Sequence, residues 1–510
     1  MTLAPTLMVQ GTGSSVGKSV LVTGLCRLFA EDGWRVAPFK AQNMSNNAVV
    51  TADGGEIGVA QAAQAAAAGI PATVDMNPIL LKPEGPAVSQ VVVRGQAIGR
   101  MGAREYHQWR GRLWPVVRRS LRDLRHQHDL VVIEGAGSPA EVNLRATDLV
   151  NMRVARAAGA AVLLVADIDR GGALAALVGT LALLTPTDRR RVRGLVINRF
   201  RGDRTLLDPG LDFLERRTRR PVVGVIPWLD GLAVPPEDSM ELGRPGSRPP
   251  RPAAAGATLD VVIVRLPRVA NFDEFLALER EPGVRVRWVD RAADLGDPDL
   301  CILPGSKTTL ADLAALHAGG LAPALRAAVS RGTACLGICG GYQMLGEAVA
   351  DPAGLEGPTG SAPGLGLLPV RTVLGARKVV RRVGVRVRPA AGLLAAAVGA
   401  ELSGYEIHRG RTRWTGRGGA ALAPFTVAGR AEGASAAGGW VVGSHLHGLL
   451  HDQTLRRALL GAVARRRGRT WVPGAPLDLD GAGQVAAALR EHLDLTRLRS
   501  WIGEVPCSPR

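Results

Sequence analysis

Cys339 lies in a pattern typical of a nucleophilic thiol. Segment 333–346, TACLGICGGYQMLG, has an apolar stretch, then a glycine-flanked cysteine, then an amphipathic stretch. Glycines on both sides allow the sharp strand-to-helix turn that exposes a nucleophile. The helix N-terminus that follows would favour the thiolate and supply oxyanion N–H donors, including that of Gly340. The pattern therefore predicts acyl chemistry at Cys339.

A thiolate nucleophile needs a base, and the sequence offers two histidines close together. Segment 439–450, GWVVGSHLHGLL, predicts a strand that ends in His445 and His447. On one strand these side chains would point the same way, so their spacing alone leaves both open. The turn in segment 303–308, LPGSKT, follows another predicted strand, and we expect the N–H of Gly305 to complete an oxyanion hole.

The other four cysteines lack such a context. Cys335 lies in the apolar stretch before the nucleophile, which favours a place in the core. Cys26, Cys301 and Cys507 have no activating neighbours, and no pair has CxxC or metal-ligand spacing. We therefore expect no disulfide framework, in agreement with a cytoplasmic protein. The sequence has no signal-peptide pattern at its start and no apolar run long enough for a membrane span.

Segment 10–20, QGTGSSVGKSV, has the composition of a phosphate-binding loop. It follows a predicted strand and precedes a predicted helix, as such loops do. Gly11 and Gly17 enclose five residues, one more than the standard spacing. Lys18 would reach the β- and γ-phosphates of ATP, and the Ser19 hydroxyl would bind Mg²⁺. The residues expected to contact the nucleotide in this loop are Gly11, Thr12, Gly13, Gly17, Lys18 and Ser19.

Two polar side chains end predicted strands of the same half. Segment 130–137, LVVIEGAG, ends a buried strand on Glu134 and enters a glycine-rich turn. A carboxylate there could hold Mg²⁺ at the carboxyl edge of a parallel sheet, or it could cap a helix or form an ion pair. Asn198 ends the strand in GLVIN, where it could contact the nucleotide base or form a turn.

The order of predicted elements indicates an α/β protein with two domains. In the first half, β-branched runs alternate with Ala-rich helical stretches, which is typical of a parallel sheet covered on both faces. The predicted strands are 6–9, 35–38, 130–134, 161–167, 194–198 and 222–226, and the helical stretches are 17–31, 57–68 and 104–127. We place this domain at 1–240.

Segment 241–257 has no periodicity and contains four prolines, which predicts a linker. A second α/β pattern follows at 258–452. Its predicted strands are 259–266, 284–289, 300–303 and 333–338, with a helix at 309–330. Residues 453–510 form a helical, Arg-rich C-terminal extension with a polar tail.

The formal charge of +18 does not by itself indicate a nucleic-acid partner. The 63 basic residues include only five lysines, a preference that base composition of the coding DNA explains. A positive field also suits polyanionic substrates such as ATP and a multi-carboxylate. We therefore expect no nucleic acid and no membrane among the partners, and the sequence indicates no oligomeric state.

The motifs together resemble a known family over essentially the whole chain. The first half is similar to dethiobiotin synthetase-type ATPases, whose phosphate loop also carries the extra residue, and the second half to class I glutamine amidotransferases. This fusion occurs in cobyric acid synthases and in cobyrinic acid a,c-diamide synthases. The segments that favour the former are KAQNMSNN at 40–47, GGEIGVAQ at 54–61, MNPILLKP at 76–83, SQVVVRGQ at 89–96 and EGAGSPAEVNL at 134–144. GYEIHRGRT at 404–412 is similar to the signature of this amidotransferase branch.

The resemblance implies a phosphate-loop domain followed by a flavodoxin-like amidotransferase domain. It implies that Cys339 is the nucleophile and that His447 is its base. Class I enzymes carry a glutamate two residues after the histidine, whereas this chain has Leu449, so the acid that orients His447 is left open. The set implied for ATP and Mg²⁺ is Lys18, Ser19, Glu134 and, as a weaker metal candidate, Glu56.

The implied substrates are ATP, glutamine and adenosylcobyrinic acid a,c-diamide, amidated at its b, d, e and g carboxylates. The nearest alternative is a cobyrinic acid a,c-diamide synthase. A basic, DNA-associated partitioning-type ATPase is another, but that family places a lysine near the start of its phosphate loop, where this chain has Thr12 and Gly13. A degenerate regulatory protein is a third, and the presence of both sets of site residues argues against it.

Overall fold

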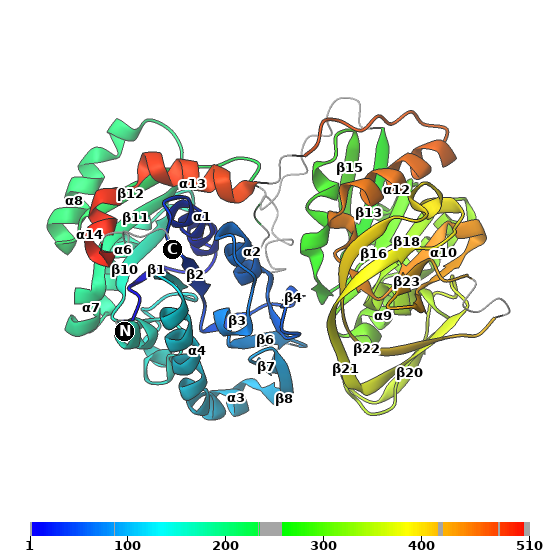
Figure 1. Cartoon of the computed structure of the whole chain (residues 1–510), viewed down its shortest axis with the longest axis horizontal. Helices are drawn as coiled ribbons and strands as arrows, with labels where there is room; N and C mark the ends of the chain where they lie inside the picture. The colour runs from blue at the N-terminus through cyan, green and yellow to red at the C-terminus, as the bar shows by residue number, and fades with distance from the viewer. Residues whose placement is uncertain are drawn as a thin grey trace.

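The computed structural model describes residues 3–85, 87–232, 234, 258–416, 422–477 and 480–503. The chain forms two α/β lobes that lie side by side (Figure 1). The predicted linker at 241–257 and Cys507 lie outside the described residues, so the predicted boundaries stay predictions. Within the described parts, no helix is both long and apolar enough to cross a membrane.

A six-stranded parallel sheet forms the centre of the first lobe, with strand order β12-β11-β10-β1-β9-β2. Its central strands are apolar runs buried along almost their whole length, because helices cover both faces. The predicted runs are confirmed as strands β1 (Thr6–Gly11), β2 (Val36–Phe39), β9 (Leu130–Glu134), β10 (Ala161–Asp167), β11 (Val192–Phe200) and β12 (Val222–Pro227).

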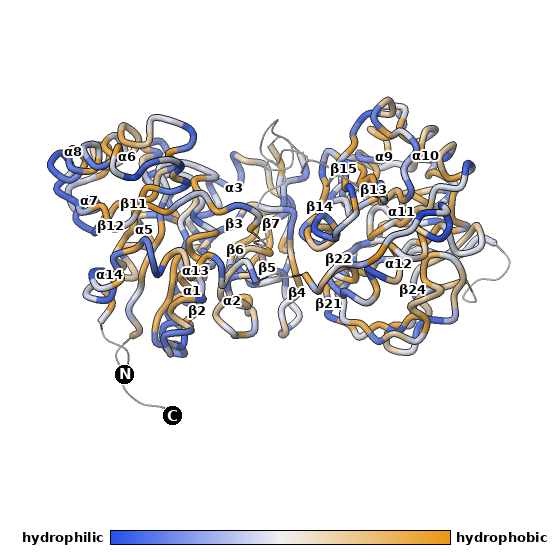
Figure 2. Tube along the Cα trace, turned by 90° about the horizontal axis from the view of Figure 1, so that it is seen from above, coloured by the Kyte–Doolittle hydropathy of each residue, from blue (hydrophilic) through white to orange (hydrophobic). Residues whose placement is uncertain are grey.

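The three helical stretches predicted for this lobe are present, one of them divided, and its described residues form four further helices that the sequence analysis did not predict. Stretch 104–127 is broken into α3 (Ala103–Trp109) and α4 (Trp114–Gln127), and Pro115 lies in the first turn of α4, where a missing N–H is tolerated. The outer helices α7 and α8 are hydrophilic and the strands hydrophobic (Figure 2). The remaining helices are α1 (Lys18–Glu31), α2 (Val59–Ala67), α5 (Met152–Ala158), α6 (Ala173–Leu183), α7 (Pro186–Arg191) and α8 (Asp208–Thr218).

A small sheet of order β3-β6-β7-β8 and a ribbon of β4 and β5 extend the first lobe toward the second. Side chains of β4, β6 and β7 pack in one buried apolar cluster with Tyr405 and Ile407 of the second lobe. The amide oxygen of Asn47 accepts a hydrogen bond from the N–H of Phe272 at 3.1 Å, which also joins the lobes. The strands are β3 (Gln42–Met44), β4 (Ala48–Val50), β5 (Glu56–Gly58), β6 (Ile79–Pro83), β7 (Val88–Val93) and β8 (Gln96–Gly102).

A second sheet, of order β15-β13-β16-β18-β26-β25, forms the centre of the second lobe. It is parallel except that β25 runs antiparallel to β26. The helix predicted at 309–330 is divided into α9 (Thr309–Ala318) and α10 (Leu321–Ser330), because Gly320 has a φ of 72°, which a helix excludes. The strands are β13 (Leu259–Val264), β15 (Val284–Val289), β16 (Leu300–Leu303), β18 (Ala334–Ile338), β25 (Ala434–Ala436) and β26 (Val441–Ser444).

A mixed, largely antiparallel sheet covers one side of this lobe (Figure 1). Its centre is the long pair β21 (Val370–Val387) and β22 (Glu401–Trp414), which the sequence did not predict. The other strands are β19 (Ala348–Asp351), β20 (Gly360–Pro363), β23 (Phe425–Val427), β24 (Arg430–Glu432) and β27 (Leu446–His447).

The predicted C-terminal extension belongs to both lobes. Helix α12 (Gln453–Arg466) packs into the second lobe, whereas α13 (Gly481–His492) and α14 (Leu495–Ile502) return to the first and lie beside α1 (Figure 1). The N–H of Asp494 donates to the carbonyl of Val223 at 2.8 Å, at the edge strand β12. A Cβ on Gly24 of α1 would lie 2.3 Å from Val485, so α1 and α13 approach closely.

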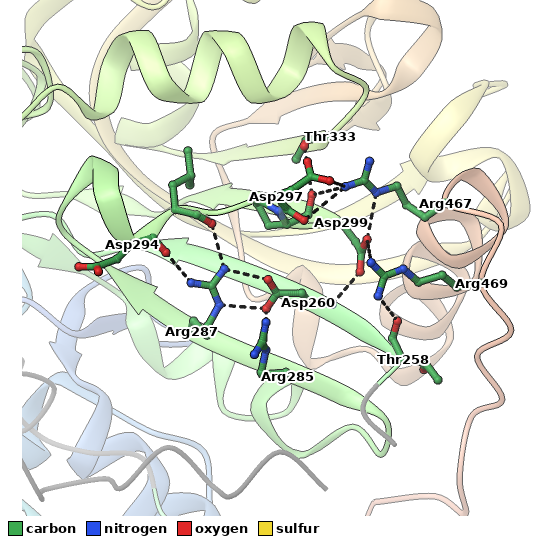
Figure 3. Close-up of polar contacts among 12 residues, drawn as sticks. Thr258, Asp260, Arg285, Arg287, Asp294, Asp297, Asp299, Thr333, Arg467 and Arg469 are labelled. Carbon is green, nitrogen blue, oxygen red and sulfur yellow. Dashed lines mark hydrogen bonds and ion pairs between the residues drawn. The ribbon is translucent and has the colours of Figure 1, made fainter. Parts of the chain in front are cut away.

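A network of arginines and aspartates lies at the amino ends of β13 and β16 (Figure 3). The buried carboxylate of Asp299 forms ion pairs with Arg467 at 3.0 Å and Arg469 at 3.1 Å. Arg469 also donates to the carbonyl of Thr258 at 2.7 Å. The network thus joins Thr258, just before β13, to Arg467 and Arg469, which follow α12 (Gln453–Arg466).

Candidate active site

Cys339 lies at the turn between β18 and α11 (Gly340–Leu345) with φ 51° and ψ −107°. A residue with a side chain rarely adopts this conformation, so the turn is strained, as in other turns that present a nucleophile to a pocket. Close packing explains the neighbouring glycines. A Cβ on Gly341 would lie 2.0 Å from the carbonyl oxygen of Leu303, and a Cβ on Gly340 would lie 2.8 Å from the backbone nitrogen of Ser306.

His447 lies between Cys339 and a buried carboxylate. Its side chain is hydrogen-bonded to the Cys339 thiol, and its Nδ1 lies 3.1 Å from Oε1 of Glu274. The other oxygen of Glu274 accepts a hydrogen bond from the N–H of Gly448 at 3.1 Å. Burial by itself lowers the pKa of His447, but the charge and hydrogen bond of Cys339, together with Glu274, raise it to about 10. The geometry therefore favours an imidazolium beside the sulfur.

Glu274 is the acid that the sequence left open. It lies on a 3-10 turn, Phe272–Phe275, 173 residues before His447 rather than two residues after it. The only local signal is a pair of adjacent acids in the otherwise apolar stretch 269–278, VANFDEFLAL, which follows a buried strand. Side chains at the carboxyl ends of parallel strands meet at one sheet edge, and this rule could have brought Glu274 into consideration.

His445 has a different environment from His447. The prediction that the two side chains point the same way is wrong, because β26 ends before His445 and β27 pairs with β22 in the other sheet. The Nδ1 of His445 lies 3.1 Å from Glu432 and its Nε2 lies 3.2 Å from the hydroxyl of Thr412. Its ring stacks on His408 at 4.0 Å between centroids. These partners hold His445 as part of the framework around the site.

One pocket contains Cys339 and His447 and is lined by both lobes. Gly305 lies at its wall, where a Cβ would come within 3.0 Å of the His447 ring. Charged side chains of both signs suit the α-carboxylate and α-ammonium groups of an amino acid such as glutamine. The charged and amide side chains from the two lobes include Lys82, Gln90, Lys307, Glu356, Lys378 and Arg409.

The phosphate loop has the strand–loop–helix placement that the sequence predicted. Lys18 Nζ donates to the carbonyl oxygens of Gly13 at 2.8 Å and Gly137 at 3.2 Å, so it is folded over the loop. Gly17 has a φ of 96°, and a Cβ there would lie 2.1 Å from the Asn198 amide. That amide donates to the carbonyl of Val16 at 2.8 Å. In this structure Asn198 therefore supports the loop backbone, and base contact stays a prediction.

Glu134 joins Ser19 of the phosphate loop to two other side chains. Its carboxylate accepts from the Ser19 hydroxyl at 3.0 Å, from Lys40 at 2.7 Å and from Gln64 at 2.6 Å. All four residues except Ser19 are buried. The hydroxyl and carboxylate oxygens of Ser19 and Glu134 are donors that Mg²⁺ prefers, usually together with phosphate and water. From the sequence, Lys40 was noted only as part of the motif at 40–47, and no role was predicted for Gln64.

Glu56 lies apart from this group. One of its carboxylate oxygens pairs with Lys82 at 2.9 Å and the other with Lys378 from the second lobe. Burial by itself raises the pKa of Glu56, but the charges of the two lysines lower it to about 2. Both oxygens are thus engaged in ion pairs, which argues against Glu56 as a metal ligand. Across the described ranges, no cluster of three or more His, Cys, Asp or Glu side chains could hold a metal.

A phosphate-loop domain joined to a cysteine–histidine amidotransferase domain defines a glutamine-dependent ligase. Residues 7–242 match the model of the CobQ/CobB/MinD/ParA nucleotide-binding domain, and residues 260–455 match the CobB/CobQ-like glutamine amidotransferase domain. The chain is 53% identical to the cobyric acid synthase of Sorangium cellulosum over 93% of each chain. It is 48% identical to that of Pelotomaculum thermopropionicum over 98% of this chain and 97% of the relative.

The chain belongs to the cobyric acid synthase family, and it is a glutamine-dependent ligase of cobalamin biosynthesis. The comparisons confirm the predicted fold class and the family resemblance. They also argue against the partitioning-type ATPase, because the matches include the amidotransferase domain as well as the nucleotide-binding domain.

Proposed function

We propose that this protein amidates the b, d, e and g carboxylates of adenosylcobyrinic acid a,c-diamide and so forms adenosylcobyric acid. Glutamine supplies the nitrogen and ATP the energy. The observation that carries the proposal is the buried Cys339–His447–Glu274 arrangement in a pocket shared with the nucleotide-binding lobe. The name of the full-length relatives supports the corrinoid substrate and favours it over a,c-diamide synthesis.

The first half-reaction releases ammonia from glutamine. Cys339 Sγ attacks the side-chain amide carbon, and the N–H groups of Gly305 and Gly340 would stabilise the oxyanion that forms. The proton held by His447 goes to the leaving nitrogen, so that ammonia departs and a glutamyl thioester remains. Water, deprotonated by the same imidazole, then attacks the thioester and releases glutamate.

The second half-reaction activates the acceptor carboxylate. A carboxylate oxygen attacks the γ-phosphorus of ATP and gives an acyl phosphate and ADP; ammonia then attacks the acyl carbon and releases phosphate. The Lys18 ammonium would stabilise charge on the transferred phosphoryl group. Ser19 and Glu134, whose oxygens lie 3.0 Å apart, would hold Mg²⁺, which neutralises phosphate charge.

The domain assignment follows from these roles. The ATP-dependent domain comprises residues 1–240, completed by α13 and α14, and the amidotransferase domain comprises 258–452, completed by α12. We also infer a cytoplasmic location. Its support is that the four cysteines among the described residues are buried free thiols, as in a reducing compartment.

The test is mass spectrometry of adenosylcobyrinic acid a,c-diamide incubated with the protein, ATP, Mg²⁺ and glutamine. We expect four successive amidations. A Cys339→Ala variant should lose all of them with glutamine and keep them with ammonium chloride, whereas Lys18→Ala should lose them with either nitrogen source. No mass change in the wild type with either source, or reaction only on cobyrinic acid, would overturn the proposal.

A further inference from the structure

The residues proposed for the two half-reactions lie at two separate places. At one end, the pocket with Cys339 has Lys82 and Lys378 in its wall, and both lysines bond to Glu56. At the other end, Glu134 bonds to Ser19 beside the phosphate loop. The segment from Glu56 through β5 and α2 leads from the first of these places to the second.

Amide side chains occupy the space between these ends. Gln61 and Gln64 lie three residues apart on one face of α2, which corresponds to about 4.5 Å along the helix axis. The oxygen of Gln61 accepts from the Asn43 amide at 3.0 Å, and the Gln64 amide donates to Glu134 at 2.6 Å. Gln61 and Gln64 are fully buried and Asn43 is 3% exposed. A row of buried amide side chains therefore leads from Asn43 through Gln61 and Gln64 to Glu134.

The row has unused hydrogen-bonding capacity. Among the described residues, Gln61 Nε2 and Gln64 Oε1 have no hydrogen-bond partner, although both atoms are buried. Leaving a buried donor or acceptor unpaired is costly, and native proteins usually place water or a ligand beside such atoms. One of these atoms is a donor and the other an acceptor. A small molecule that both donates and accepts hydrogen bonds, as ammonia does, matches this pair.

We propose that ammonia passes from the Cys339 pocket to the phosphate-loop site along the row formed by Asn43, Gln61 and Gln64, with the Glu56–lysine cluster at its entrance. The inference rests on the proposed function and adds the path that ammonia takes between the two sites. Two lysines against one glutamate leave the entrance with net positive charge, which disfavours ammonium and admits neutral ammonia. The burial of the row keeps ammonia from water, where it would be protonated.

The test substitutes Gln61, whose side-chain hydrogen bond joins it to Asn43 rather than to Cys339 or Glu134. Gln61→Leu and the less branched Gln61→Met remove the amide at nearly constant volume. The matched control is Trp34→Phe, because Trp34 is also buried and its Nε1 also has no partner in the described structure. The Trp34 ring packs against Phe29 at 6.1 Å between centroids, outside the row. Glutamate release, amidation with glutamine and amidation with ammonium chloride are measured for each variant.

We expect both Gln61 variants to hydrolyse glutamine and to amidate with ammonium chloride at wild-type rates. Amidation with glutamine should fall about tenfold, as the loss of one hydrogen bond in the path predicts, and glutamate released per amide should rise. Trp34→Phe should leave that ratio unchanged. A wild-type ratio in Gln61→Leu and Gln61→Met, or an equal loss with both nitrogen sources, would overturn the route. Absence of amidation by the wild type with either nitrogen source would instead overturn the proposed function.

Discussion

Replacing Glu274 with glutamine should impair glutamine hydrolysis and spare synthesis from free ammonia. The amide has nearly the shape of the carboxylate, and its oxygen can still accept from the N–H of Gly448, as Glu274 does at 3.1 Å. What is lost is the negative charge that faces Nδ1 of His447, also at 3.1 Å. Because both side chains are 1% exposed, water cannot replace that charge.

The size of the effect follows from two terms. A hydrogen bond to a charged group contributes about 1.5–3 kcal/mol, and about 1.4 kcal/mol is tenfold in rate, so the bond alone predicts a loss of about 10- to 150-fold. The new amide can also donate to Nδ1 and stabilise the tautomer that has no free nitrogen toward the sulfur. The same acid-to-amide change in serine protease triads costs about 10⁴-fold. We therefore expect kcat for glutamate release to fall by at least about 100-fold in Glu274→Gln.

The assay follows glutamate release over a pH series, with ammonium-dependent amidation measured in parallel. Removing Glu274 also removes one cause of the raised pKa of His447, so the alkaline limb of the glutaminase profile should move to lower pH. The matched control is Asp273→Asn, since Asp273 is the adjacent buried acid and its oxygen lies 3.8 Å from His451. Glutaminase activity in Glu274→Gln close to that of the wild type, or an equal loss in both variants, would refute the reasoning.

Three further results are expected. Burial lowers the pKa of Lys378 to about 8, below its ordinary 10.5, so the folded protein loses this proton, and the ion pair with Glu56, as pH rises through about 8. The entrance then loses positive charge, so the glutamate released per amide should rise between pH 7 and 9. Lys378→Arg stays charged and should flatten this rise. A ratio that does not change with pH would contradict the argument. Arg456→Met should lower the free energy of unfolding of the second lobe in urea by about 3–5 kcal/mol, because it removes a buried partner of Glu281. The more exposed Arg457→Met should cost less, and equal losses would count against the argument. A chain ending at 477 should lose ATP binding, measured by fluorescence titration against a chain ending at 503, because it uncovers the face of α1 that α13 buries; full binding would refute that role.

Local patterns predicted the parts of the fold that depend on local physics. Most strands of the two parallel sheets are continuous apolar runs, and those were located to within a few residues because burial on both faces requires such runs. The glycines around Cys339 and in the phosphate loop also predicted sharp turns. The long pair β21 and β22 was missed, because its side chains alternate between buried and exposed and arginines occupy many outward positions.

Contacts between distant segments could not be predicted in this way. Glu274 reaches His447 across 173 residues, and Lys378 reaches Glu56 across 322 residues and from the other lobe. No spacing rule links such positions, since the fold alone brings them together. The same holds for Gln64, whose role depends on a carboxylate that it meets only after α2 packs beside β9.

The return of α13 and α14 to the first lobe gives the two lobes an unexpected order of completion during synthesis. The first lobe is begun first, yet the apolar face of α1 stays uncovered until Val485 and Leu489 leave the ribosome. At about 5–20 residues per second, translation reaches Val485 and Leu489 on the order of 10–50 s after it completes the first part of this lobe, residues 1–240. The second lobe is encoded later, but its last helix, α12, is synthesised before α13 and α14, so its fold can be completed earlier. A newly made chain thus exposes the apolar face of α1, next to its phosphate loop, for most of its time on the ribosome. We expect a chaperone that binds exposed apolar surface to bind there.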